Sequence, residues 1–141
     1  MLISIVIPVH NEAENIGDLL EEITRLPSVH SYYTIVVDDA SSDGTPEILN
    51  RKKKEMPNLE IISHSEQCGQ SAALVTGIKS AAGDVVATMD GDGQNDPEDI
   101  PKLLDALLRN KSCHMAVGYR KKRKDTAWRI FSSRVANTVR S

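Results

Sequence analysis

The sequence predicts an α/β fold with a mostly parallel central sheet that helices cover on both faces. β-Branched runs and amphipathic helical stretches alternate along the whole chain, which is the pattern of α/β proteins. The strand-like runs are almost continuously apolar, as in strands that are buried on both faces. Polar loops follow several of these runs, and ligands bind at the carboxyl ends of the strands in open α/β sheets.

The first expected elements are two strands and the helix between them. Residues 2–8 form an uninterrupted β-branched run, which predicts a buried strand. A helix follows, because the next apolar residues share one stripe at helical spacing: Ile16, Leu19, Leu20, Ile23 and Leu26. Pro27 ends this helix, and residues 33–37 form the second strand.

Turn and cap residues divide the middle of the chain. Residues 41–44 form a turn, after which Thr45 is the expected N-cap and Pro46 the first residue of a helix to about residue 56. Residues 59–62 predict a short third strand. A third helix then runs to Gly83 and contains Ala72, Ala73, Leu74 and Ile78.

The remaining chain continues the alternation. Residues 84–89 predict a fourth strand, and Asp96 and Pro97 then supply the N-cap and first position of a helix. The apolar face of that helix consists of Ile100, Leu103, Leu104, Leu107 and Leu108. A fifth strand is expected at 114–117. A last helix is expected from Thr126 to the end, with Trp128, Phe131 and Val135 on one side.

Composition restricts the class of protein. The chain has 141 residues, of which 40% are hydrophobic and 26% charged, as in a soluble globular domain. No run reaches the roughly 20 apolar residues of a membrane span. The start of the chain is strand-like and lacks the basic region of a signal peptide. Cys68 and Cys113 lie far apart without metal-type spacing, which favours free thiols in a reducing cytoplasm.

Charge is distributed unevenly along the chain. Residues 1–119 hold 9 Lys and Arg against 19 Asp and Glu, a net charge of −10, whereas residues 120–141 hold 8 against 1, a net charge of +7. A basic segment on an acidic body suggests an anionic partner, such as lipid headgroups at a membrane surface. The alternatives for this segment are a solvated basic helix and a flexible loop around residues 121–124.

The stretch 89–97 carries the strongest chemical signal. Asp90 and Asp92 follow a buried strand and can lie on the same side of an extended segment. Gly91 and Gly93 let the backbone approach a ligand closely. Hard divalent cations prefer oxygen ligands, and magnesium usually shares them with substrate phosphates. The stretch therefore predicts a site for a metal ion and a diphosphate.

Other interpretations of these aspartates can be tested against the sequence. A polar turn without a ligand remains open. An EF-hand loop starting at Asp90 needs Gly at its sixth position and Glu at its twelfth, but the chain has Asn95 and Pro101 there. A phosphatase pattern resembling D-x-D-x-[TV] is weakened by Gln94 without being excluded. The glycine-rich fingerprints of standard NAD and P-loop sites are missing.

Three segments at expected strand ends resemble the family 2 glycosyltransferases of the GT-A fold. Residues 4–12 (SIVIPVHNE) resemble the opening strand of that family, residues 37–45 (VDDASSDGT) resemble its V-D-D-x-S-x-D-G-T block, and residues 90–92 form the D-x-D motif. The resemblance covers essentially the whole chain. It implies a Rossmann-like three-layer sandwich, of which residues 1–141 would be the N-terminal, nucleotide-sugar-binding part. We expect this part to be incomplete at its C-terminus and able to bind a donor without turnover.

Within the family, the sequence is similar to polyprenyl-phosphate glycosyltransferases, including dolichol-phosphate mannosyltransferases. These share D-x-D-x-Q-x-x-P, a later G-x-R and a downstream R-x-x-x-S; the corresponding residues are Asp90, Asp92, Gln94, Pro97, Gly118, Arg120, Arg129 and Ser133. The resemblance implies an inverting, metal-dependent enzyme that moves a sugar from a GDP- or UDP-sugar to dolichyl or undecaprenyl phosphate. It places the enzyme at the cytoplasmic face of a membrane, without a nucleic-acid partner. The alternatives are a polysaccharide or other sugar acceptor, a D-x-D phosphohydrolase and a non-catalytic nucleotide-binding module.

The resemblance also implies roles for individual residues. The residues expected at the nucleotide-sugar are Pro8, His10, Asn11, Glu12, Asp39, Gln70 and Asp90, with Asp39 on the base. The expected ligands of Mg²⁺ or Mn²⁺ are Asp90, Asp92 and Gln94. The residues expected at the acceptor phosphate are Arg120, Arg129 and Ser133, and those with a catalytic role are Asp90, Asp92 and Arg120. Packing is the alternative for His10, and turn formation is expected of Asp43 and Gly44.

Overall fold

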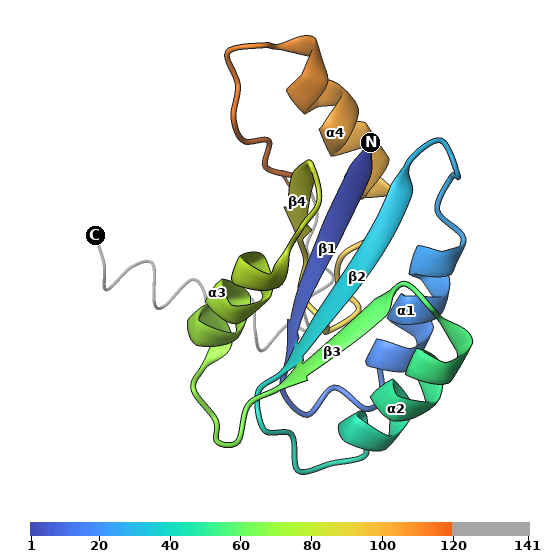
Figure 1. Cartoon of the computed structure of the whole chain (residues 1–141), viewed down its shortest axis with the longest axis vertical. Helices are drawn as coiled ribbons and strands as arrows, with labels where there is room; N and C mark the ends of the chain where they lie inside the picture. The colour runs from blue at the N-terminus through green and yellow to red at the C-terminus, as the bar shows by residue number, and fades with distance from the viewer. Residues whose placement is uncertain (120–141) are drawn as a thin grey trace, which may run out of the picture.

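The structure is a computed structural model that describes residues 1–119 of the chain. Its four strands form one sheet in the order β3-β2-β1-β4 (Figure 1). The central strand β1 (Leu2–Val9) pairs in parallel with β2 (Ser31–Asp38) on one side and with β4 (Val85–Thr88) on the other. β3 (Leu59–Ser63) pairs in parallel with the outer side of β2. The prediction of an α/β fold with a parallel sheet is confirmed.

Helices cover both faces of this sheet, so the domain has three layers. Figure 1 shows α1 (Ile16–Thr24) and α2 (Thr45–Glu55) on one side of the strands and α3 (Gln70–Ser80) on the other. α4 (Asp99–Arg109) adds two buried side chains to the same apolar cluster that α1 and α2 share. The smaller cluster on the opposite face contains Ala73 of α3.

Alternation of side chains along β1 explains why this strand is largely apolar. Ile3, Ile5 and Ile7 belong to the larger cluster on the side of α1, whereas Val6 belongs to the smaller cluster under α3. All four side chains are buried. Burying one such side chain contributes about 1.5–3 kcal/mol, so both faces of the strand favour the fold.

The closest approach of a helix to the sheet occurs at Gly77 in α3. A Cβ atom at this position would lie 2.3 Å from Cγ1 of Val6 and 3.1 Å from Cγ2 of Val37. These distances leave no room for a methyl group. Gly77 therefore sets the distance between α3 and the strands whose ends form the candidate site.

Three expectations about the elements need correction. Residues 114–117 do not form the expected strand, because the run contains one β-branched residue and Met115 and Val117 are 77% and 76% exposed. α3 ends at Ser80, before Gly83. α4 begins at Asp99 and not at Pro97, as the expected N-cap at Asp96 implied. Asp96 Oδ1 still accepts a hydrogen bond from the amide of Glu98 at 2.9 Å, which is the kind of contact that an N-cap side chain makes.

The last expected helix, from Thr126 to the end of the chain, lies outside the described residues. Among the helices of residues 1–119, none combines the length and the hydropathy that a membrane span requires.

We predict that Gly77→Ala lowers the free energy of unfolding by about 1–3 kcal/mol, because the new methyl group must displace α3 or the side chains beneath it. Urea denaturation monitored by circular dichroism measures the change. Gly17→Ala in α1 is the matched control, since its Cβ would lie 3.5 Å from Cγ2 of Ile48, an ordinary contact. The control should raise stability by about 0.5–1 kcal/mol. Equal effects of both substitutions would contradict the close approach at Gly77.

Candidate functional site

The carboxyl ends of the parallel strands bring the predicted loops together around a cavity of about 330 Å³. The predicted residues that line it are Pro8, His10, Glu12, Asp39, Gln70, Asp90 and Asp92. This volume lies within the range of small-molecule sites. Segments that are far apart in sequence thus contribute to one cavity, as the resemblance implied.

Asp39 is the most extensively hydrogen-bonded side chain of this cavity. Its Oδ1 accepts hydrogen bonds from the amide of Cys68 at 2.8 Å and from Nδ1 of His64 at 2.8 Å, and its Oδ2 accepts one from the amide of Gly69 at 2.8 Å. The Cys68 amide, together with His64 and the Gly69 amide, lowers the pKa of Asp39 against the opposing effect of burial. The carboxylate is therefore ionised at neutral pH and holds the loop between β3 and α3 in place.

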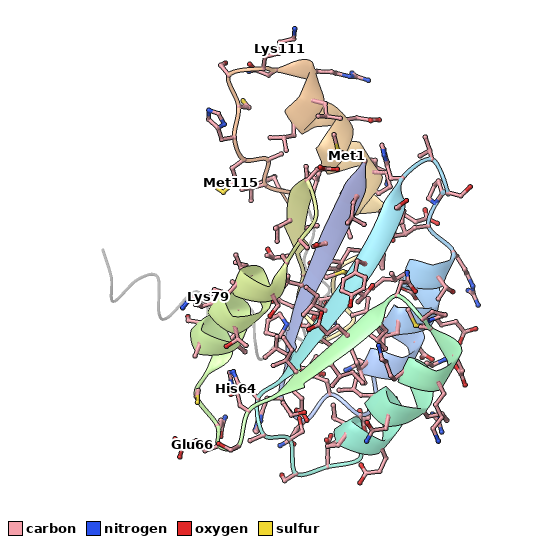
Figure 2. All side chains as sticks on the ribbon, viewed as in Figure 1. Met1, His64, Glu66, Lys79, Lys111 and Met115 are labelled. Atoms are coloured by element: carbon pink, nitrogen blue, oxygen red, sulfur yellow. The ribbon has the colours of Figure 1, made fainter. Side chains whose placement is uncertain are left out.

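His64 is a residue of this site that the sequence did not reveal. It follows the last residue of β3, and Figure 2 shows it on the segment that leads from β3 to α3. Its Nε2 lies 2.9 Å from Oγ1 of Thr76, whose hydroxyl donates to the carbonyl of Ala72 at 3.0 Å. Its position directly after a strand was the signal that could have identified it, because β3 ends at the same edge as β2.

Asn11 connects the loop after β1 to the loop after β2. The side-chain Oδ1 of Asn11 accepts a hydrogen bond from the backbone amide of Ser42 at 2.8 Å. The backbone amide of Asn11 donates a hydrogen bond to Oγ of Ser41 at 2.9 Å. Asp38 supports the second loop by accepting hydrogen bonds from both the backbone amide and the hydroxyl of Ser41. Asn11 and Ala40 have positive φ values of 53° and 56°, so both loops turn sharply here.

Thr45 and Asp43 fix the loop that contains Glu12. Thr45 is not the N-cap that we expected, because its Oγ1 accepts a hydrogen bond from the amide of Glu12 at 2.9 Å and Gly44 occupies the cap position. Asp43 accepts hydrogen bonds from the amides of Thr45 at 2.9 Å and Ala13 at 3.1 Å. Burial raises the pKa of Asp43, but hydrogen bonds from Thr45 and Ala13 lower it by more. The expected turn role of Asp43 agrees with these contacts.

His10 makes a structural contact within the site. Its Nδ1 donates a hydrogen bond to the backbone carbonyl of Asp39 at 2.7 Å, which joins the ends of β1 and β2. This contact agrees with the packing alternative for His10. A contact with substrate remains a prediction, because the side chain also lines the cavity.

Asp90 and Asp92 line the same cavity from the loop after β4. Nε2 of Gln70 donates a hydrogen bond to Oδ1 of Asp90 at 2.8 Å, so the first turn of α3 orients this carboxylate. Gly91 lets the loop cross the end of β1, because a Cβ atom there would lie 2.5 Å from Cγ1 of Val9. The donor set of two carboxylates fits a hard divalent cation.

Gln94 is not brought into the same cavity as the two aspartates. It lines a second, larger cavity of about 990 Å³, which reaches α4 and residues 117–119. Asp90 lines both cavities, and the two therefore meet at this carboxylate. The residues predicted to bind the acceptor phosphate, Arg120, Arg129 and Ser133, lie outside the described residues.

Comparison with known proteins gives one family and several relatives. The model of the family described as "Glycosyl transferase family 2" matches residues 4–140. A dodecaprenyl-phosphate galacturonate synthase of Rhizobium johnstonii is 40% identical over 128 residues, which cover 87% of this chain and 37% of the relative. A dolichol-phosphate mannosyltransferase of Pyrococcus furiosus is 34% identical over 131 residues, which cover 93% of this chain and 37% of the relative. The chain thus spans little more than a third of the length of these relatives.

A solved structure shares both fold and sequence with this chain. It is a mannosyltransferase of Pyrobaculum calidifontis in complex with GDP-mannose and Mn²⁺, with a TM-score of 0.59 and 32% sequence identity. The similarity covers 64% of this chain and 27% of the other.

We predict that the unfolding free energy decreases in acid partly through Asp39, whose folded-state pKa is lowered. Its stabilising contribution is complete above the ordinary carboxyl pKa of roughly 3.9 and is lost as the pH falls through the lower folded value. Urea denaturation at pH 7 and at pH 3 should show that the free energy of unfolding falls by less in Asp39→Asn than in the unaltered chain. At pH 7 the variant should be less stable, because an amide nitrogen would face a backbone N–H. An identical pH dependence of both proteins would contradict this contribution.

Proposed function

Because the chain belongs to glycosyl transferase family 2, we propose that it forms the donor-binding part of an enzyme that transfers a sugar from a nucleotide diphosphate to a polyprenyl phosphate. The family membership confirms the resemblance in the sequence, and the fold is that of the GT-A glycosyltransferases. The relatives named for dodecaprenyl and dolichol phosphate support the choice of acceptor. We further propose inversion at the transferred sugar carbon.

One observation carries the donor proposal: the same cavity is lined by the hydrogen-bonded carboxylate of Asp39 and by the carboxylate pair of Asp90 and Asp92. Asp39 would accept a hydrogen bond from the base, because its Oδ2 has one described protein donor and can accept another. Asp90 and Asp92 would lie near the diphosphate. The cavity residues Pro8 and Glu12 would flank the nucleoside.

A divalent cation fits the carboxylate pair. Asp90 and Asp92 would hold Mg²⁺ or Mn²⁺, with Gln94 as a further proposed ligand. The bound cation would neutralise the charge that develops on the departing nucleoside diphosphate. Gln70 would keep Asp90 oriented toward the cation through its hydrogen bond. The Mn²⁺ ion in the structure of the Pyrobaculum relative supports the class of metal.

The larger cavity is the proposed acceptor side. It meets the donor cavity at Asp90 and extends to Tyr119, which directly precedes Arg120 in the sequence. We propose that Arg120, Arg129 and Ser133 bind the lipid phosphate, because Arg matches phosphate geometry and Ser can donate a hydrogen bond. A phosphate acceptor is ionised at neutral pH and needs no strong general base.

The lipid acceptor also suggests where the whole protein works. We propose association with an anionic membrane surface on the cytoplasmic side; the whole protein can carry membrane helices beyond residue 141. The net charge of residues 120–141, with 8 basic residues against 1 acidic residue, supports attraction to anionic headgroups.

Calorimetric titration with UDP and GDP, each with and without Mn²⁺, tests the donor proposal. We expect Mn²⁺-dependent binding of one nucleotide and its loss in Asp92→Ala, because one carboxylate alone holds the cation weakly. Asp105→Ala is the matched control, since Asp105 is an exposed residue of α4 that lines neither cavity. Unchanged Mn²⁺-dependent affinity in Asp92→Ala would refute the metal assignment. Release of inorganic phosphate without nucleotide preference would favour a phosphohydrolase.

Arg129→Ala tests the acceptor proposal. The variant should keep Mn²⁺-dependent nucleotide binding and lose binding to vesicles that contain polyprenyl phosphate, measured by co-sedimentation. Arg134→Ala removes the same charge from the basic segment at a position that is not proposed to bind the lipid phosphate, and it serves as the control. An effect of Arg129→Ala on nucleotide binding alone would overturn the acceptor role.

A further inference from the structure

Three potential metal ligands of different chemistry converge beside the donor cavity. A carboxylate oxygen of Asp39, an imidazole nitrogen of His64 and the thiol sulfur of Cys68 all lie within 4.8 Å of one another. We propose that these three side chains form a second metal site, which binds Zn²⁺ or a similar transition-metal ion and is separate from the Asp90–Asp92 pair.

The mixture of donor atoms determines which metal the site would select. Zn²⁺ accepts sulfur, nitrogen and oxygen ligands together, and three protein ligands with one open position form a common zinc arrangement. Mg²⁺ instead prefers oxygen ligands in octahedral geometry and does not favour a thiolate. The proposed site would therefore discriminate against the Mg²⁺ that the Asp90–Asp92 pair would hold.

Backbone contacts place the ligands before any metal arrives. The amides of Cys68 and Gly69 donate to the carboxylate of Asp39, which fixes the loop carrying the thiol against the end of β2. His64 directly follows β3 and already contacts Asp39. The ligands thus come from two segments, the end of β2 and the β3–α3 loop, and the hydrogen bonds between these segments reduce the entropy that metal binding must overcome.

A second hydrogen bond orients the imidazole of His64. Metal-bound histidines usually donate their other ring N–H to a neighbouring acceptor, and this contact supports metal affinity. Nε2 of His64 lies 2.9 Å from Oγ1 of Thr76, and the hydroxyl of Thr76 donates to the carbonyl of Ala72. The hydroxyl oxygen can therefore accept from Nε2–H while Nδ1 points toward Asp39.

Metal binding requires a defined exchange of protons. The ion would replace the Nδ1 proton between His64 and Asp39, and that proton would pass to solvent. The metal-bound ring would carry one proton on Nε2, bonded to Thr76; a ring that was already doubly protonated keeps this proton, and a neutral ring takes it from solvent. Cys68 would release its thiol proton to solvent and give up its contact with the carbonyl of Glu66 at 3.3 Å. The thiol is exposed, so the side chain can turn toward the ion.

Occupation of this site has a consequence for the donor cavity. Asp39 lines that cavity and is the proposed contact of the base. An ion bound to this carboxylate would compete with the nucleotide, so Zn²⁺ would inhibit donor binding. This consequence rests on the proposed function, whereas metal binding by the three side chains does not.

Titration of the 141-residue chain with Co²⁺ alone tests the site, because a thiolate ligand gives Co²⁺ a charge-transfer absorption that carboxylates do not. We expect a saturable absorption band that Zn²⁺ abolishes and that Cys68→Ser lacks. The band should remain in Cys113→Ser, which removes the other exposed thiol, and in Asp92→Ala. Thr76→Val should weaken Zn²⁺ affinity about 10-fold or more. Thermal melting should show that Cys68→Ser remains folded.

The outcomes separate the two proposals. Absence of the band, or its persistence in Cys68→Ser, would overturn the metal site. If the band follows the expected pattern but Zn²⁺ leaves Mn²⁺-dependent UDP or GDP binding unchanged, the competition is refuted. If neither nucleotide binds, the donor proposal fails while the Co²⁺ result still decides the metal site.

Discussion

The carboxylate of Asp39 connects most of the parts on which the candidate site depends. It extends from the end of β2 and accepts hydrogen bonds from the Cys68 amide, the Gly69 amide and His64. These bonds stabilise the charge and position the start of α3. From that helix, Gln70 reaches across the cavity to Asp90. The orientation of the D-x-D motif is thereby linked, through one helix end, to a buried carboxylate on another strand.

This linkage changes how substitutions at the site should be interpreted. Replacing Asp39 by a small apolar residue would leave two backbone amides without their acceptor in addition to removing any contact with a ligand. A loss of nucleotide binding would then have two causes. The side chain of Asp92, by contrast, accepts a hydrogen bond from the backbone amide of Gln94, only two residues away. Replacing Asp92 therefore disturbs a local contact and not a contact between distant loops.

The fold was predictable because its strands are mostly apolar and alternate with amphipathic helices along the chain. The sequence motifs also identified most residues that line the cavity of about 330 Å³, since Pro8, Asp39 and Asp90 lie at or near the carboxyl ends of strands. The contacts of His64 and Thr45 were not predictable, because they depend on which loops meet in space. The strand expected at 114–117 was wrong, because a short apolar run forms a strand only when a neighbouring strand can pair with it.

The order of the sheet has a consequence during protein synthesis. β1 is made first but occupies the centre of the sheet, and its contact with the segment before β4 joins Leu2 to Asp84, 82 residues away. At ≈ 5–20 residues per second, the ribosome needs roughly 4–16 s to make the intervening chain. During this interval one edge of β1 lacks its native partner strand. Until β4 is made, the backbone N–H and C=O groups on this edge of β1 lack their native partners and can pair with another strand.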